Sequence, residues 1–188
     1  METLETARLR LRPFVPADVD GLAALHGDAE VVRYIEPRPV PREVVAGKTL
    51  PGILAAYAEL PAGLGYRVVE ERAGARFAGW VDLAPPASVG LEDEEGLELG
   101  YRLRRAVWGR GYATEAARAL VGLAFGRLGA DRIVATTMAV NSGSRRVMEK
   151  LGLRHLRTFF ADWPEPLEGA EHGDVVYELT RDRWSSAH

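Results

Sequence analysis

The chain has 188 residues, of which 47% are hydrophobic and 27% are charged, and its formal net charge at neutral pH is −3. This length suits one domain with a single sizeable core, and this composition excludes a disordered or fibrous protein. The slightly acidic balance argues against a protein whose main partner is a nucleic acid or an anionic membrane. We therefore expect one mixed α/β domain over residues 1–188.

The sequence has no cysteine, which excludes disulfides, thiolate nucleophiles and cysteine-zinc sites. Its histidines are too scattered for a metal motif; they are His26, His155, His172 and His188. The N-terminal residues contain no apolar signal segment, and no apolar stretch approaches the ~18 residues of a membrane span. We expect a cytoplasmic protein without a metal or a membrane partner.

The first third of the chain predicts one strand followed by several helical pieces. Arginine and leucine alternate over residues 8–14, which is the period of a half-buried strand. Residues 16–25 begin with a proline and carry an apolar stripe, so they predict a helix, and residues 28–35 predict a second short one. A further helix over 42–60 is interrupted at Pro51 and could act as a kinked lid.

The middle of the chain changes to the period of strands. Residues 66–71 and 76–83 are strand-like and are joined by a short hairpin. The acidic run at 92–95 predicts a solvated loop, because four like charges are rarely buried. This loop leads into another strand at 97–103.

Residues 112–128 are the clearest helix in the sequence, with alanine and leucine along one face and a glycine at its end. The remaining elements are a strand at 131–139, a helix that is capped by Asn141 or Ser142 and runs to Leu151, and strands at 153–160 and 174–180. No repeat or linker interrupts this order of elements.

The turn between the strand at 97–103 and the helix at 112–128 carries the chemical information. Gly109 and Gly111 open directly onto the helix, so unpaired backbone N–H groups and the positive end of the helix dipole point at one spot. Glycine matters there because a side chain would block the approach of an anion. Arginines that could meet a phosphate surround the turn: Arg102, Arg104, Arg105 and Arg110.

Two phosphate-binding motifs do not fit this turn. The lysine and Ser/Thr of a P-loop are absent, and the third glycine of a dinucleotide fingerprint is missing because Thr114 and Glu115 occupy that region. A tight connection without a ligand remains the alternative. The residues alone thus favour an anion site without naming the anion.

Beyond the turn, the chain resembles the GNAT N-acetyltransferases, and within them the RimJ/RimL branch of ribosomal-protein N-terminal acetyltransferases. The acetyl-CoA signature of that family, Gln/Arg-x-x-Gly-x-Gly/Ala, falls on residues 108–113, although Trp108 departs from its first position. The matching segments are RLRLRPF at 8–14, LHGDAEV at 25–31, GYRL at 100–103, WGRGYATEA at 108–116, NSGSRRVMEKLG at 141–152, and YELT at 177–180 with Trp184.

The resemblance implies the GNAT fold, an α/β fold with a mostly antiparallel, twisted sheet of about seven strands. The sheet would splay between strands 4 and 5 and carry helices on both faces. Acetyl-CoA would be the co-substrate, with its pyrophosphate on the backbone of the turn and its pantetheine on the backbone of strand 4. The residues expected to bind it are Tyr101, Leu103, Arg104, Trp108, Gly109, Arg110, Gly111, Tyr112, Ala113, Thr114, Asn141, Arg145 and Arg146.

Some of these residues have a plain structural alternative. Asn141 matches an asparagine that contacts pantetheine in the family, and it also suits a helix cap. Arg104, Arg145 or Arg146 would meet the 3′-phosphate, and arginines on a helix surface are as often solvated spectators.

Direct acetyl transfer needs a neutral amine, a polarised thioester carbonyl and a proton for the departing thiolate. Glu98 matches a strand acid that family members use as a base through water, and its alternative is an outward-facing carboxylate. The usual tyrosine acid of the family is replaced by Met148. The RimL branch, which this chain resembles, offers a serine instead, and this resemblance makes Ser144, with Ser142 second, the candidate acid, unless either serine only caps the helix. A backbone N–H near Leu103 would polarise the carbonyl.

We therefore expect an N-acetyltransferase that acts on the α-amine of a protein or peptide. The alternatives are a small-amine acetyltransferase for a polyamine, an amino acid or an aminoglycoside, and a non-catalytic acyl-CoA-binding module. A homodimer is expected only by analogy. Aromatic residues that could wall the acceptor pocket, or equally belong to the core, are Tyr34, Trp80, Trp163 and Tyr177.

Overall fold

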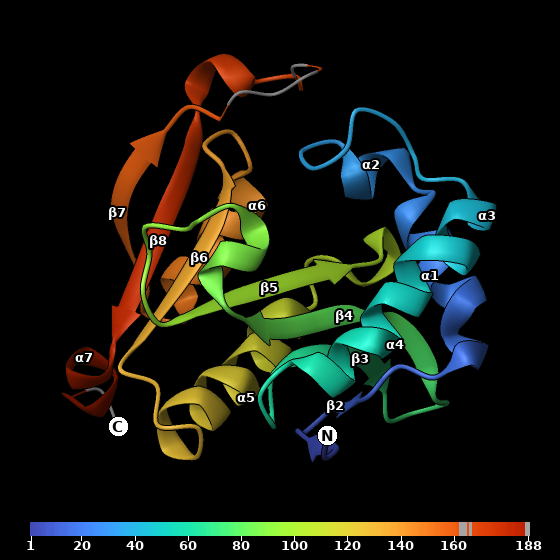
Figure 1. Cartoon of the computed structure of the whole chain (residues 1–188), viewed down its shortest axis with the longest axis horizontal. Helices are drawn as coiled ribbons and strands as arrows, with labels where there is room; N and C mark the ends of the chain where they lie inside the picture. Colours follow the sequence, from blue (N-terminus) through green and yellow to red (C-terminus); the bar gives the residue numbers. More distant parts are fainter. Residues whose placement is uncertain (162–164, 166, 187–188) are drawn as a thin grey trace.

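A twisted sheet of eight strands organises the part of the chain that the computed structural model describes, residues 1–161, 165 and 167–186. Its strands are β1 (Leu4–Glu5), β2 (Leu9–Arg12), β3 (Gly65–Glu71), β4 (Arg76–Ala84), β5 (Leu97–Leu103), β6 (Arg132–Met138), β7 (Arg154–Phe159) and β8 (Asp174–Thr180). Their order across the sheet is β1-β2-β3-β4-β5-β6-β8-β7 (Figure 1). Neighbouring strands are antiparallel except β5 and β6, which are parallel.

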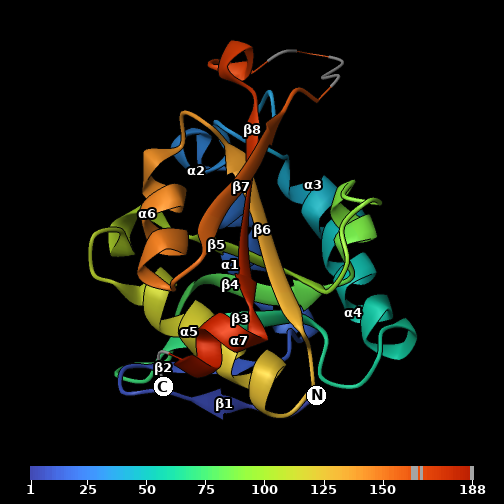
Figure 2. The same ribbon diagram turned by 90° about the vertical axis from the view of Figure 1, so that its left-hand side faces the viewer.

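Helices lie on both faces of this sheet. They are α1 (Val19–His26), α2 (Ala29–Val32), α3 (Arg42–Val44), α4 (Leu50–Glu59), α5 (Tyr112–Gly126), α6 (Ser142–Lys150) and α7 (Arg181–Ser186). Figure 2 shows α5 and α6 on one side of the sheet and α3 and α4 on the other. The predicted α/β fold, mostly antiparallel with helices on both faces, is confirmed; β1 and α7 are additions that the sequence did not indicate. No helix of the described residues has the length and apolar character that a bilayer span requires.

The sheet splays between β5 and β6, as expected. These two strands pair only where Leu97 meets Ile133 and Glu98 meets Val134. Beyond that point β5 stays paired with β4 as far as Leu103, and β6 stays paired with β8. The two strands therefore diverge toward their carboxyl ends, as Figure 1 shows.

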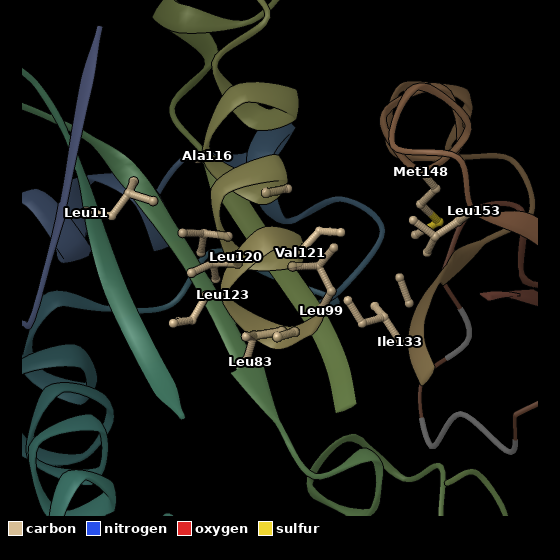
Figure 3. Packing of buried hydrophobic residues seen from close by; sticks show 14 of the residues in the cluster. Leu11, Leu83, Leu99, Ala116, Leu120, Val121, Leu123, Ile133, Met148 and Leu153 are labelled. Carbon is tan, nitrogen blue, oxygen red and sulfur yellow. The ribbon is translucent and has the colours of Figure 1, made fainter. Parts of the chain in front are cut away.

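The main core lies between α5 and the sheet. The face of α5 with Ala116, Leu120 and Ala124 is buried, as the apolar spacing predicted. It packs on strand leucines such as Leu11 and Leu99 (Figure 3). A second cluster under α1 and α4 covers the opposite face of β2 to β4; its buried members are Phe14, Leu22, Ala23, Leu25, Val31, Val45, Leu50, Ile53 and Val68.

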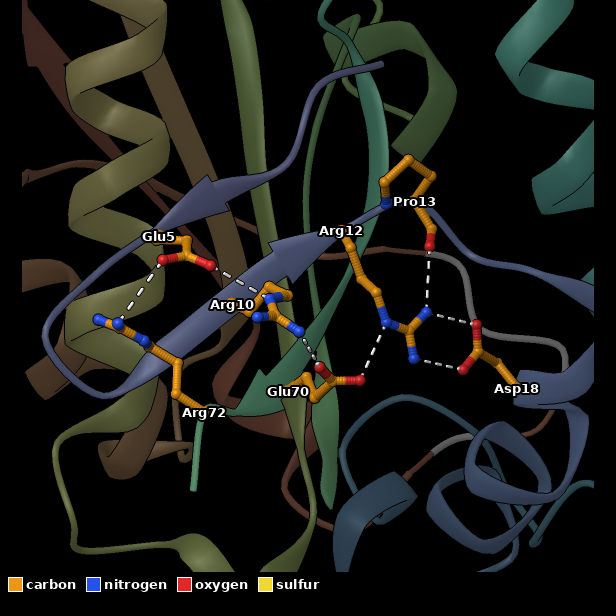
Figure 4. Close-up of polar contacts among 7 residues, drawn as sticks. All are labelled: Glu5, Arg10, Arg12, Pro13, Asp18, Glu70 and Arg72. Carbon is orange, nitrogen blue, oxygen red and sulfur yellow. Dashed lines mark hydrogen bonds and ion pairs between the residues drawn. The ribbon is translucent and has the colours of Figure 1, made fainter. Parts of the chain in front are cut away.

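The alternating sequence of β2 is explained by what lies on each side of it. Leu9 and Leu11 are fully buried in the main core. Arg10 and Arg12 face the other way, where both reach the Glu70 carboxylate, and Arg12 also grips Asp18 with two hydrogen bonds of 2.8 Å (Figure 4). The network fixes the entry of the chain into α1, because Asp18 also accepts the backbone N–H of Val15.

The structure corrects the expected interruption at Pro51. The helical segment is continuous from α3 through a wider π-helical turn at Val45–Thr49 into α4. Pro51 lies in the first turn of α4, and the wider turn before it accommodates a residue that has no N–H to donate.

The acidic run at 92–95 is not simply a solvated loop. The Glu94 side chain is only 7% exposed and pairs with Arg132 at 2.8 Å and with Arg157 at 3.0 Å, on β6 and β7. Glu92, Asp93 and Glu95 are exposed. Two arginines from distant segments supply the counter-charge that the local sequence does not.

Candidate active site between the splayed strands

The backbone of the turn that joins β5 to α5 has a conformation that suits the binding of an anion. Gly109 and Gly111 adopt φ angles of +75° and +79°, which L side chains rarely adopt. Among the described residues no side chain caps the first turn of α5, so its N–H groups are unsatisfied within the protein. These groups and the helix dipole both favour an anion at this point.

The turn is held in place from two sides. Arg8 pairs with Glu115 on α5 at 2.6 Å and donates to the Arg110 carbonyl at 2.9 Å. The Trp108 indole donates to the Leu103 carbonyl at 2.7 Å. A cavity of about 590 Å³ adjoins the turn and brings further cations to it; its lining is Thr6, Arg8, Gly111, Thr114, Glu115, Arg118, Ala119 and Lys150.

Backbone groups of β5 are directed into the gap, by which we mean the space between β5 and β6 beyond their last residue pair. The Arg104 N–H donates to the Ala78 carbonyl on β4, at 2.8 Å. Because backbone groups alternate in direction along a strand, those of Leu103 and Tyr101 point away from β4, toward the gap. The Leu103 carbonyl is occupied by the Trp108 indole, which leaves its N–H directed at the gap.

Asn141 is the N-cap of α6. Its Oδ1 accepts the Ser144 N–H at 3.2 Å, and its Nδ2 donates to the Thr137 hydroxyl at 3.0 Å. The structural alternative for this residue is therefore realised. The cap also places Asn141 where β6 ends, on the other side of the gap from Leu103.

Ser144 meets a partner that the sequence did not indicate. The Tyr101 hydroxyl lies 2.9 Å from the Ser144 hydroxyl and donates to the Ser144 carbonyl at 3.0 Å, joining β5 to α6. The Ser142 hydroxyl instead accepts from Arg146. Met148, at the position of the family tyrosine, is 1% exposed and belongs to the main core.

The arginines expected at the 3′-phosphate have different surroundings. Arg145 is turned inward, donating to the Tyr177 hydroxyl and the Ala139 carbonyl. Arg146 is exposed and bonds the Ser142 carbonyl. Arg104 is exposed near the hairpin that joins β3 and β4, where it donates to the Phe77 carbonyl.

Of the remaining four expected residues of the turn, Arg110 and Tyr112 contribute to its base. The Tyr112 hydroxyl donates to Glu71, at the end of β3, and Arg110 lies 3.6 Å from the same carboxylate. The Ala113 and Thr114 side chains are half-buried in the first turn of α5.

Glu98 lies on the sheet face opposite α5 and is 4% exposed. Asp82, on β4, is 3% exposed on the same face. Burial, with Asp82 nearby, raises the pKa of Glu98 well above its ordinary range, and burial raises the pKa of Asp82 as well. The sequence did not indicate Asp82, because a single acid within an apolar strand gives no sign of what lies across the sheet.

The aromatic residues expected near the acceptor are not gathered in one place. Trp80 contacts Tyr66 edge to face at 5.0 Å between ring centres, on the same sheet face as Asp82. Tyr177 is buried under α6, where its hydroxyl contacts Glu149, so it belongs to the core. Tyr34 is half-buried beside Arg33, and Trp163 lies outside the described residues.

Comparison with known proteins identifies the family. A family model described as an acetyltransferase (GNAT) domain matches residues 8–154. A relative from Aspergillus fumigatus named FsC-acetyl coenzyme A-N(2)-transacetylase is 34% identical over 97% of this chain and 77% of its own.

Solved structures show the same fold. An acetyltransferase from Agrobacterium tumefaciens superposes with a TM-score of 0.72 at 26% identity, over 95% of this chain and 94% of its own. RimL, described as a ribosomal L7/L12 alpha-N-protein acetyltransferase in complex with coenzyme A, has a TM-score of 0.76 at 18% identity, over 97% and 99% of the two chains. The chain therefore belongs to the GNAT family and is an acetyl-CoA-dependent acetyltransferase.

Proposed function

We propose that this enzyme transfers the acetyl group of acetyl-CoA directly to the N-terminal α-amine of a protein or peptide. The observation that carries the proposal is the uncapped first turn of α5, which opens beside the unpaired edge of β5 while a buried carboxyl lies on the opposite face. Donor and acceptor can then meet from opposite sides of the splay.

Two stretches of backbone are available to acetyl-CoA. The N–H groups of residues 111–114 would receive the pyrophosphate, with Arg118 and Lys150 as the cations of the adjoining cavity. Tyr101 and Leu103 would pair with the pantetheine through main-chain groups at the open edge. The bound co-substrate would supply the thioester, and these contacts would hold its acetyl group at the open edge of β5.

Glu98 is the proposed base. Burial makes its carboxylate a stronger base than an exposed one, since the raised pKa favours the protonated form. An α-amine of pKa about 7.8 costs only about 1 kcal/mol to deprotonate at neutral pH, against about 4.6 kcal/mol for a lysine-type amine. An N-terminal acceptor therefore matches a site in which the proposed base is a carboxylate.

Ser144 is the proposed acid, held by Tyr101. The two hydroxyls are within hydrogen-bond distance, and the phenol stays protonated because burial raises the pKa of Tyr101. The proton that Ser144 gives to the leaving thiolate is replaced by the second proton of the amine nitrogen, which is released as the C–N bond forms, while the Tyr101 hydroxyl holds the serine in place. No covalent protein nucleophile is needed, which agrees with the absence of cysteine.

A small-molecule amine is the second candidate acceptor. It is favoured by the relative from A. fumigatus, which shares more sequence with this chain than RimL does and is named for FsC. The RimL likeness concerns the fold and does not decide between the two acceptors.

A thiol-release assay over matched panels tests the proposal. N-terminal peptides should react, and their N-terminally blocked forms should not, whereas polyamines, amino acids and aminoglycosides should react at least tenfold more slowly. Glu98→Gln should lower kcat/KM for the peptides by about 100-fold at neutral pH. A faster reaction with small amines than with every peptide would favour the second candidate.

A further inference from the structure

We propose that Asp82 is the second carboxyl of the acceptor site: Asp82 and Glu98 act as a pair that holds one proton and presents a single negative charge to the ammonium of the acceptor. The inference rests on the proposed function, because it assigns a positioning residue to the same base.

The register of the sheet brings the two side chains together. Asp82 lies directly opposite Gly100, and Ala84 lies opposite Glu98. Asp82 and Glu98 are therefore diagonal neighbours on one face of an antiparallel pair. Both have less than 5% of their surface exposed.

A glycine makes room for the aspartate. A Cβ built on Gly100 would overlap the Asp82 Oδ1, so a residue with a side chain at position 100 would displace the carboxyl. The Gly100 backbone also hydrogen-bonds the Asp82 carboxyl. Asp82 is thus folded against the β5 backbone, on the strand that carries Glu98.

The pair lacks a neutralising ion pair. Within residues 1–161, 165 and 167–186, neither carboxyl has an arginine, lysine or histidine within salt-bridge distance. Asp82 acts electrostatically on Glu98, and two buried carboxylates that repel each other retain a proton. Because no cation is in direct contact with either carboxyl, the ammonium of an acceptor can take that place.

The charged and titratable groups around the pair come from several elements. Arg67 on β3 and Arg102 on β5 act on Asp82 as distant positive charges. Burial raises the pKa of the hydroxyls of Tyr66 on β3 and Tyr101 on β5, and both lie close enough for the negative charge of the pair to raise it further. From α1, His26 contacts Arg102, and burial with the Arg102 charge lowers the pKa of His26 to about 4, so it adds no charge at neutral pH.

The proton balance of the step is simple. The ammonium passes one proton to the singly protonated pair, the neutral amine forms the C–N bond, and the C–S bond breaks. The second nitrogen proton leaves with the thiol, and the pair returns its extra proton to solvent. Asp82 acts through Glu98, because its charge sets how strongly the pair holds the transferred proton.

Difference infrared spectroscopy of the whole protein tests the pair without needing a substrate. The wild type should lose two carboxyl protons in coupled steps above the ordinary range of acids. Asp82→Asn, which keeps the shape of the side chain, should leave one step, at lower pH than the upper step of the wild type, because the repulsion is gone. Asp93→Asn, the same change on an exposed loop, should leave both steps in place.

Kinetics give the second readout. Asp82→Asn should lower kcat/KM for the amine at least tenfold while the Kd of acetyl-CoA, measured by calorimetry, changes less than twofold. Its Tm at pH 8 should equal or exceed that of the wild type, since a buried charge is removed. An unchanged infrared titration, or a lowered Tm with unchanged kinetics, would overturn the pair. Absence of turnover with every amine in the wild type would instead refute the proposed function and leave the infrared result to decide on Asp82.

Discussion

At the scale of single residues, Ser144 and Tyr101 are the pair that we propose in place of the family tyrosine, whose position Met148 occupies. Met148 is packed into the core, yet a phenol from β5 reaches the same helix through the Ser144 hydroxyl. The sequence motif indicated Tyr101 only through its backbone, because nothing in the chain order says which side chain of β5 faces α6. Asp82 escaped for the same reason, since the register that pairs it with Gly100 is a property of the folded sheet.

Ser144→Ala should lower kcat about 100-fold, because the leaving thiolate loses its proton donor. Tyr101→Phe keeps the serine and should lower kcat about tenfold. Ser142→Ala is the matched control, since the Ser142 hydroxyl contacts Arg146 and not Tyr101, and its kcat should stay within twofold of the wild type. Single-turnover thiol release measures all three. A slow Ser142→Ala with a normal Ser144→Ala would exchange the two assignments.

At the scale of elements, α5 is the part of the chain that the sequence predicts best. The contacts of Glu115 that hold the start of this helix are the part that it predicts least. The apolar period gave the buried face with Ala116, Leu120 and Ala124. Glu115 gave no comparable signal, although it accepts hydrogen bonds from Thr6 and from both the backbone and side chain of Arg8. Pro51 misled because local sequence does not show that a π-helical turn precedes it.

Glu115→Gln should loosen the start of α5. The variant loses the charge that holds Arg8, and Arg8 in turn supports the Arg110 carbonyl within the turn. The free energy of unfolding should fall by about 1–2 kcal/mol, measured by urea denaturation, and the Kd of acetyl-CoA should rise several-fold. Glu171→Gln removes an exposed carboxylate and should change neither quantity. A wild-type Kd in Glu115→Gln would show that the turn keeps its shape without this anchor.

At the scale of the whole molecule, ion pairs join segments that are far apart in the sequence, and the local sequence of each segment does not predict these pairs. Glu94, from the connection between β4 and β5, binds Arg132 on β6 and Arg157 on β7. Leu91 packs beside it on Val134 and Val176. The sequence indicated a loop there, and the loop is present; its role as a cover over β6 and β8 depends on partners tens of residues away.

Glu94→Gln should loosen the segment at 85–96, which covers β6 and β8. Because two arginines lose a shared carboxylate, the free energy of unfolding should fall by about 2 kcal/mol. Hydrogen exchange should quicken over residues 85–96 and stay unchanged in α5. Glu92→Gln, two residues away and exposed, is the control and should exchange like the wild type. Equal exchange in both variants would mean that Leu91 and its neighbours suffice to hold the segment.

The short pairing between β5 and β6, of only two residue pairs, separates the proposed donor side of the sheet from the proposed acceptor side. The groups proposed to hold the acyl donor come from one contiguous stretch of about fifty residues that begins at β5 and ends within α6, whereas the opposite face is roofed by α1 to α4. With the site assigned as proposed, substitutions in α1 to α4 would change which amine binds and would leave the residues that hold acetyl-CoA unchanged. Evolution can thus diversify the acceptor of this scaffold while its acyl-donor chemistry stays constant.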